Sequence, residues 1–269
     1  MQTVTRDGVE IAYEQRGRSA NDAPSVVLVE GLGYGRWMWR WQADALADDY
    51  HVVLPDNRGT GESDAPEGPY TVEQMAADLE AVLADTGVET VHVVGASMGG
   101  MIAQRYALSS DRAASLSLFC TSPGGDDAVA TPDETLARMF SVPEDADERE
   151  AIRYKMAPAL SEGFPEANPE LIERIVDWRL ASDAPPAARE AQAAAVEAFD
   201  ASDELGDLDV PTLVLHGTGD RVLPVENGEL LTELLTDPET TFYEDGSHLF
   251  FLEESERVNE RLRGFLDAA

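Results

Sequence analysis

Short apolar runs rich in valine and leucine alternate along the chain with segments whose apolar residues recur every three or four positions. One such segment, TVEQMAADLEAVLADTG, carries both helix ends: Thr71 as an N-cap with Gln74 after it, and Gly87 as the C-terminal stop. Continuous apolar strands alternating with helices favour an α/β fold, with a mostly parallel central sheet and helices on both faces. A further helix is expected over residues 36–49. The predicted strands are 25–31, 51–59, 89–95, 114–120, 211–217 and 240–246.

Two segments depart from this alternation. The first residues, MQTVTRDGVEIAYEQRG, are typical of two strands joined at Asp7-Gly8, a hairpin-turn dipeptide. Residues 126–205 contain no convincing strand, and their apolar residues recur at helical spacing, as in NPELIERIVDWRL. We therefore divide the chain into a sheet-containing core, residues 1–125 and 206–269, and a helical insertion, residues 126–205.

The sequence GASMG, residues 95–99, lies where an apolar strand ends and a helix is expected from about Met98. It matches G-x-S-x-G, in which a sharp turn strains the backbone at the serine and glycines avoid clashes on either side. Such a turn presents the Ser97 hydroxyl at the carboxyl end of the sheet, beside the N–H groups that open the helix. The motif therefore predicts Ser97 as a nucleophile, against the alternative of an ordinary turn with a chance serine.

A serine nucleophile needs a base that accepts its proton, and the chain has four histidines. His248 follows a predicted strand and a glycine loop, which places it at the same sheet edge as Ser97. Asp220 lies in the loop after the preceding strand, in HGTGDRVLP, so the order serine, aspartate, histidine is the one this architecture uses. The other histidines lie in or at the ends of strands, where we expect structural roles: His51, His92 and His216.

These motifs resemble those of the α/β-hydrolase family, and the likeness covers nearly the whole chain. It rests on the elbow GASMGG, the acid loop HGTGDRVLP, the histidine loop DGSHLFFLE and the turn PDNRGTGESD. The resemblance implies that Ser97 attacks a carbonyl, that His248 transfers the proton and that Asp220 holds the imidazolium. It also implies that residues 126–205 are a cap, or lid, above the site.

Other acids compete for the role of Asp220. The family's alternative acid position follows its sixth strand, which here falls near Asp126 or Asp127. Asp245 is close to His248 in sequence, but we expect it on the other side of the loop. Asp220 is the preferred acid.

An oxyanion hole requires two N–H donors, and the residue after the nucleophile, Met98, is expected to supply one. The second is expected from the loop VEGLGYG, at Leu32. This loop often begins with His-Gly in the family, whereas here Glu30 precedes Gly31. A carboxylate there would oppose a developing oxyanion unless it is turned away or paired, for instance with an arginine.

An apolar cluster, GRWMWRW, follows the oxyanion loop at residues 35–41. Packing of the first helix against the sheet and cap accounts for most of these side chains. Trp37 and Trp39 are nonetheless candidates for the substrate pocket. The same two roles are open to Leu223, Phe250 and Phe251.

The chain is strongly acidic, with 53 Asp and Glu against 19 Lys and Arg and a formal net charge of −34. Phosphate binding needs cationic patches, so the charge disfavours a nucleic-acid partner, and none is expected. The acids are spread along the chain, and Lys155 is the single lysine. The composition resembles that of proteins from salt-accumulating archaea, in which about 1 M salt shortens the Debye length to ~3 Å and screens such repulsion. We therefore expect a halophilic source.

We expect a cytoplasmic protein. No apolar stretch approaches the ~20 residues of a membrane helix, and the first residues lack the basic and apolar regions of a secretory signal. Cys120 is the single cysteine, so no intrachain disulfide can form. A homodimer is left open as an assembly.

The predicted function is hydrolysis of small carboxylic esters or lactones by a serine hydrolase. Alternatives on the same triad are a C–C bond hydrolase, a cofactor-free perhydrolase or an aminopeptidase, and a binding or receptor-like module is the alternative outside catalysis. Serine at the elbow argues against dehalogenases and most epoxide hydrolases, which use aspartate there. The histidines lack metal-ligand spacing, and GLGYG lacks the dinucleotide pattern, so neither metal nor cofactor is expected.

Overall fold

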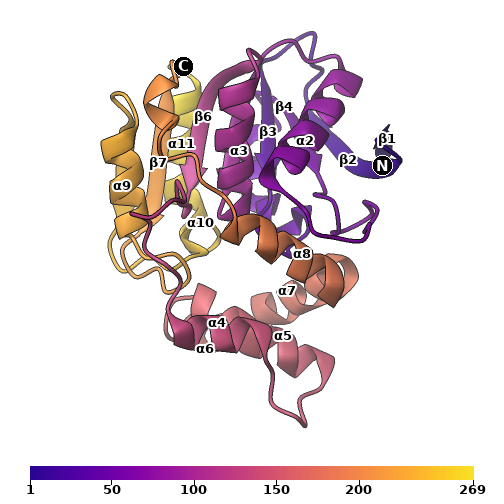
Figure 1. Ribbon diagram of the computed structural model, residues 1–269, viewed down its shortest axis with the longest axis vertical. Coiled ribbons are helices and arrows are strands. Elements are labelled where there is room, and N and C mark those ends of the chain that lie inside the picture. Colours follow the sequence, from indigo (N-terminus) through magenta and orange to yellow (C-terminus); the bar gives the residue numbers. More distant parts are fainter.

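The computed structural model describes residues 1–269 and contains one eight-stranded sheet of order β1-β2-β4-β3-β5-β6-β7-β8 (Figure 1). β1 and β2 are antiparallel to their neighbours, and every pairing from β4 to β8 is parallel. This arrangement confirms the predicted α/β class. The strands are β1 (Gln2–Arg6), β2 (Val9–Gly17), β3 (Ser25–Val29), β4 (His51–Pro55), β5 (Val91–Ala96), β6 (Ala113–Phe119), β7 (Thr212–Gly217) and β8 (Glu239–Tyr243).

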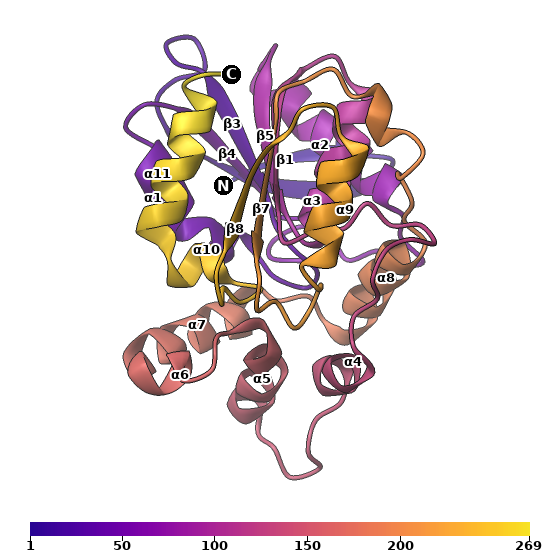
Figure 2. The same ribbon diagram turned by 90° about the vertical axis from the view of Figure 1, so that its left-hand side faces the viewer.

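Helices cover both faces of the sheet (Figure 2). One face carries α2 (Val72–Thr86), α3 (Met98–Ser109) and α9 (Glu226–Leu234), and the other carries α1 (Arg40–Leu46), α10 (Phe250–Glu253) and α11 (Ser255–Leu266). The central strands, β3 to β7, are almost completely buried on both sides, so two apolar cores form, one on each face. Fully buried strands require apolar residues at consecutive positions, which explains the continuous runs in the sequence.

Local signals in the sequence specify several element ends. Asp7 and Gly8 both have positive φ, 51° and 82°, and form the turn between β1 and β2. Thr71 and Gln74 form the predicted capping box at the start of α2, and Gly87 ends that helix at φ 73°. The helix expected over 36–49 is instead a 3-10 turn at Arg36–Trp39 followed by α1, with two different hydrogen-bond patterns.

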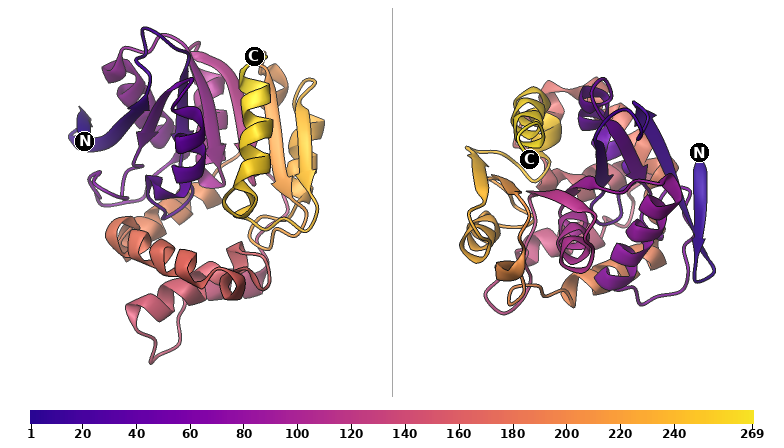
Figure 3. Two further views of the ribbon diagram at one scale, coloured as in Figure 1. Left: turned by 180° about the vertical axis from the view of Figure 1, so that it is seen from behind. Right: turned by 90° about the horizontal axis from the view of Figure 1, so that it is seen from above.

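Between β6 and β7 the chain forms five α-helices that lie across one end of the sheet (Figures 1 and 3). α8 holds this layer against the core, because the buried Gln192 accepts a hydrogen bond from the Gly33 N–H (2.8 Å) and donates one to the Arg58 carbonyl (2.9 Å). No helix of the chain has both the length and the apolar character needed to cross a membrane. The five helices are α4 (Asp133–Phe140), α5 (Glu148–Met156), α6 (Phe164–Ala167), α7 (Pro169–Ser182) and α8 (Pro186–Glu197).

Candidate active site

Ser97 occupies a strained turn between β5 and α3, with φ 55° and ψ −123°. The glycines on either side are required by close backbone contacts. A Cβ atom on Gly95 would lie 2.1 Å from the Gly99 carbonyl oxygen, and one on Gly99 would lie 2.1 Å from that of Val29. The turn is thus held by β3 and α3 together, and the strain at Ser97 is maintained by packing around it.

Asp220 and His248 form a buried hydrogen-bonded pair, with His248 Nδ1 2.7 Å from Asp220 Oδ2. The other carboxylate oxygen accepts the N–H groups of Val222 (2.7 Å) and Leu223 (3.0 Å). Burial acts to raise the pKa of Asp220, but the charge of His248 and the hydrogen bonds from both neighbouring histidines outweigh it and lower the pKa to about 2. Because an ionised carboxylate only accepts hydrogen bonds, His248 carries its proton on Nδ1 and leaves Nε2 free.

His216 was expected to have a core or turn role, and it is fully buried beside the acid. Its Nε2 donates to the Leu223 carbonyl (2.9 Å) and lies 3.3 Å from Asp220 Oδ2. The side chain therefore fixes the loop that carries Asp220. The sequence signal for this role is the position of His216 at the end of a strand, four residues before Asp220.

Ser97 and His248 line one cavity of about 40 Å³, which residues of the helices between β6 and β7 also line. No hydrogen bond joins the two side chains in this structure, and catalytic hydrogen bonds are often long or poorly aligned in the absence of substrate. The competing acids lie elsewhere: Asp126, Asp127 and Asp245 are exposed and form no contact with His248. Asp220 is the only one of the four acids that contacts it.

The two predicted oxyanion donors flank the serine. Met98 begins α3, where N–H groups have no acceptor within the helix. Leu32 lies in the loop after β3 and lines the cavity, and its N–H forms no hydrogen bond with the protein. A Cβ on the adjacent Gly31 would lie 3.4 Å from Ser97 Cβ, so this loop closely approaches the nucleophile.

Glu30 is turned away from the cavity and is completely buried. Its Oε1 accepts hydrogen bonds from the Asn57 N–H and the Thr60 hydroxyl, and its Oε2 has no partner. Burial raises its pKa well above the usual range, and the nearby Asp56 raises it further. Glu30 has no arginine partner, and its raised pKa favours the neutral form beside the oxyanion loop.

The four side chains predicted to line the pocket lie outside it: Trp37, Trp39, Leu223 and Phe250. Trp39 packs against Phe119 and Phe251 in the core, and Phe250 stacks on Tyr243. Phe251, the remaining candidate, lines the cavity, together with Met38 and Val222, which are adjacent to the four. Two cationic residues of the helices between β6 and β7, Lys155 and Arg189, line it as well, and no sequence motif points to them as site residues.

One set of ligand-type side chains converges in the molecule: donor atoms of Cys120, Asp220 and His248 lie within 4.8 Å of one another. Metals bind the thiolate form of cysteine. Burial raises the pKa of the Cys120 thiol, the charge of Asp220 raises it further, and both Asp220 oxygens already accept hydrogen bonds. This set is therefore a poor metal site.

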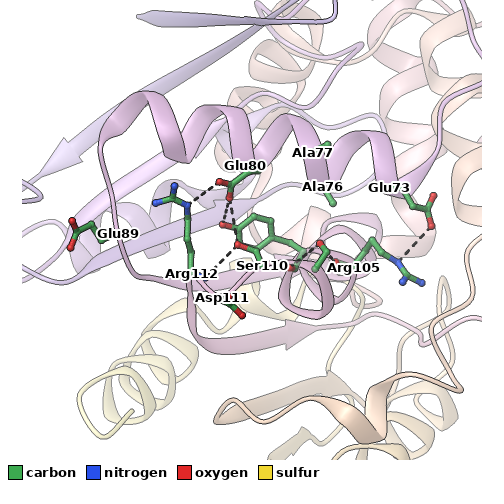
Figure 4. A pocket seen from close by; sticks show the side chains of 11 residues that line it. Glu73, Ala76, Ala77, Glu80, Glu89, Arg105, Ser110, Asp111 and Arg112 are labelled. Atoms are coloured by element: carbon green, nitrogen blue, oxygen red, sulfur yellow. Dashed lines mark hydrogen bonds and ion pairs between the residues drawn. The ribbon is translucent and has the colours of Figure 1, made fainter.

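A wider groove between α2 and α3 lies on the outer face of the molecule, away from Ser97 (Figure 4). Its two arginines are paired with acids of the same groove: Arg112 contacts Glu80 (2.9 Å) and Arg105 contacts Glu73 (3.6 Å). Two further acids that line the groove, Glu89 and Asp111, form no ion pair, so its unpaired charge is negative.

Comparison with known proteins shows the same architecture. Residues 24–255 match the family model described as the alpha/beta hydrolase fold. The chain is 32% identical to a putative carbamate hydrolase RutD of Azorhizobium caulinodans, over 95% of this chain and 94% of that protein. Among solved structures, a thermophilic esterase of Thermogutta terrifontis shares 32% identity with a TM-score of 0.82, over 100% and 99% of the two chains. An enol-lactonase of Burkholderia xenovorans shares 26% with a TM-score of 0.84, over 99% and 100%.

Proposed function

The chain belongs to the α/β hydrolase fold family, and from that premise we propose that it is a serine hydrolase that cleaves small carboxylic esters or lactones through an acyl-enzyme on Ser97. One observation carries this proposal: a strained turn presents Ser97 in the same small cavity as a histidine bonded to a buried carboxylate. Relatives described as esterase and enol-lactonase support the substrate class.

The proposed reaction has two halves. His248 Nε2 accepts the Ser97 proton while the serine oxygen attacks the carbonyl carbon, and the imidazolium then protonates the leaving alcohol as the ester bond breaks. In the second half, His248 takes a proton from water, the hydroxide attacks the acyl-enzyme, and Ser97 leaves with the proton. Asp220 holds Nδ1–H throughout and stabilises the imidazolium.

The backbone N–H groups of Leu32 and Met98 would stabilise the tetrahedral oxyanion in each half. Loss of one such donor costs about 2.7–4 kcal/mol of transition-state stabilisation in related chemistry. The raised pKa of Glu30 supports this assignment, because it favours the neutral form, and an ionised carboxylate in that position would raise the energy of the oxyanion.

The cavity and the cap bear on substrate size. A volume of about 40 Å³ accommodates a short acyl group, and longer substrates require the five helices between β6 and β7 to move. We assign these helices the role of a cap over the site. Carbamates are a second candidate substrate, because a relative described as a putative carbamate hydrolase shares 32% identity over 95% of this chain.

A fluorophosphonate probe tests the proposal directly, since it modifies only an activated serine. In about 2–3 M KCl, where surface repulsion is screened, the probe should label the Ser97 peptide. Ser97→Ala should abolish both labelling and hydrolysis of p-nitrophenyl butyrate, γ-butyrolactone or an aryl carbamate. The matched control Ser109→Ala, at the far end of α3, should retain both. A folded protein that is not labelled at Ser97 would contradict the hydrolase assignment.

We also infer a halophilic source and a salt-rich cytoplasm. The net charge of −34 and the single lysine support both inferences. Light scattering at low and high KCl would measure whether the chain forms the homodimer left open above.

A further inference from the structure

Two cationic side chains enter the cavity that holds Ser97 and His248. Lys155 comes from α5 and Arg189 from α8, and both line this inner cavity. Both also line a larger outer cavity among the cap helices, so they lie between the nucleophile and the surface. Their position is that of groups a substrate meets next to the reacting carbonyl.

Neither side chain forms an ion pair or a hydrogen bond with the protein. The Nε of Arg189 is a buried donor without a partner. Three other cationic side chains also lack both kinds of contact, but they are exposed to solvent: Arg18, Arg40 and Arg174. Lys155 and Arg189 are therefore the only partly buried cations that the protein leaves unpaired.

The acids around them do not neutralise these charges. Asp183 is the acid whose charge acts on both, and its Oδ2 accepts from Arg179 Nε at 2.7 Å. Glu148 and Glu190 line the outer cavity but pair with neither cation. In a chain with 53 acidic residues and 19 basic ones, two unpaired cations in one small cavity indicate an anionic ligand.

Arg189 also lies directly against the proposed oxyanion loop. A Cβ atom on Gly33 would lie 2.8 Å from Arg189 Nη1. Burial lowers the pKa of Lys155, and the charges of Arg189 and Arg179 lower it further, so the cations act on one another. A bound anion would relieve this repulsion.

We propose that Lys155 and Arg189 bind a carboxylate of the substrate, so that the preferred ester or lactone carries a carboxylate a few bonds from the carbonyl that Ser97 attacks. This inference rests on the proposed function and names its substrate class. Arg189 offers a planar pair of donors for the carboxylate, and Lys155 offers a second positive charge.

Matched esters test the preference. Monoethyl adipate and ethyl hexanoate differ only by a terminal carboxylate in place of a methyl group, as do monoethyl glutarate and ethyl pentanoate. Hydrolysis is followed by pH-stat at one fixed pH and KCl concentration. A charge-assisted contact predicts that kcat/KM favours the best monoester over its neutral match by about 10- to 100-fold.

Single substitutions test which residues cause the preference for the carboxylate-bearing ester. Lys155→Met and Arg189→Gln should each reduce the ratio of kcat/KM for the monoester to kcat/KM for its neutral match by about 10-fold. Lys155→Arg should keep most of it. Arg153→Gln is the matched control, because it removes the same charge from α5 but at an exposed ion pair with Glu173. It should leave the preference intact. Equal kcat/KM for charged and neutral esters, or equal loss of both in the variants, would overturn the proposal.

Binding separates this inference from the proposed function. Monoethyl adipate is titrated by calorimetry into Ser97→Ala and into Ser97→Ala with Lys155→Met, neither of which requires turnover. Stronger binding to the first protein supports the carboxylate site even if the probe fails to label Ser97 in the wild type. If the probe labels Ser97 but both proteins bind monoethyl adipate equally, the proposed carboxylate site is wrong and the proposed hydrolase function still stands.

Discussion

At the scale of single residues, the buried carboxyl group of Glu30 makes the stability of the protein depend on pH. It is buried beside the loop that carries Leu32, and one of its oxygens has no hydrogen-bond partner. Burial raises its pKa well above the usual range, so the folded protein holds a proton that the unfolded chain releases above its own pKa. Folding is therefore linked to proton uptake at this residue.

Glu30→Gln should change how stability depends on pH. Because the native state binds the extra proton, the contribution of Glu30 to the free energy of unfolding is fully present below the unfolded pKa of ~4.3 and falls as pH rises toward the folded value. Glutamine keeps the acceptor for the Asn57 N–H and removes the titration. Thermal melts at fixed KCl should show the variant gaining stability relative to wild type between about pH 5 and pH 8.

A matched variant separates burial from simple loss of charge. Glu229→Gln removes the same charge from an exposed position on α9, and its stability should follow that of wild type across this range. Parallel pH profiles for Glu30→Gln and wild type would show that Glu30 is ionised in the folded protein. The proposed oxyanion loop would then lie beside a negative charge.

Pocket residues show how far the sequence predicts individual side chains. The aromatic cluster near the site was identified, but Met38 lines the cavity while Trp37 and Trp39 do not. In the histidine loop Phe251 lines it, and Phe250 faces Tyr243. Successive residues of a helical turn point about 100° apart, so an uncertainty of one position changes which side chain reaches the cavity.

At the scale of elements, the strand-to-helix turn depends on close backbone packing at Gly99. Gly99→Ala should destabilise the protein by about 1–3 kcal/mol or more, because its Cβ would overlap the carbonyl oxygens of Val29 and Glu30. Relief of that overlap requires α3 to move away from β3, which displaces Ser97. Urea melts and fluorophosphonate labelling at fixed KCl should therefore both report a loss.

Gly264→Ala gives the opposite result for the same chemical change. Gly264 is an exposed residue within α11, and a Cβ there would meet nothing within 4 Å. Alanine should stabilise the protein by about 0.5–1 kcal/mol, the usual gain over glycine in a helix. Equal effects of the two substitutions would contradict the packing argument at the elbow.

Elements were predictable from the sequence where short-range signals decide them. The turn at Asp7-Gly8 and the capping box at Thr71 depend on neighbouring residues, and both form as expected. The placement of the five helices between β6 and β7 was not predictable. Gln192 reaches the Gly33 N–H across 159 positions of sequence, and no local pattern specifies such a contact. Lys155 and Arg189 reach the cavity only because these helices are placed there. In the sequence, Lys155 stands out as the single lysine, and nothing marks Arg189.

For the whole molecule, the dominant quantity is the net charge of −34. The 19 basic residues can pair with a minority of the 53 acidic ones, so most carboxylates repel one another. This repulsion destabilises the compact state at low ionic strength. Salt acts on it through the Debye length, which shortens from about 10 Å at 0.1 M to about 3 Å at 1 M.

The melting temperature should therefore rise steeply with KCl, and hydrolysis of neutral esters should fall when KCl is removed. Circular dichroism melts between about 0.1 and 3 M KCl measure the first effect, and sucrose, which stabilises without screening charge, is the control for solvent exclusion.

Glu233→Lys tests whether repulsion between carboxylates causes the salt dependence, since Glu233 lies in the last turn of α9, four residues after Glu229. Lysine there should add about 0.3–1 kcal/mol at low KCl and lose that advantage at high KCl. A melting temperature that is independent of KCl would refute the halophilic inference and leave the proposed chemistry at Ser97 untouched.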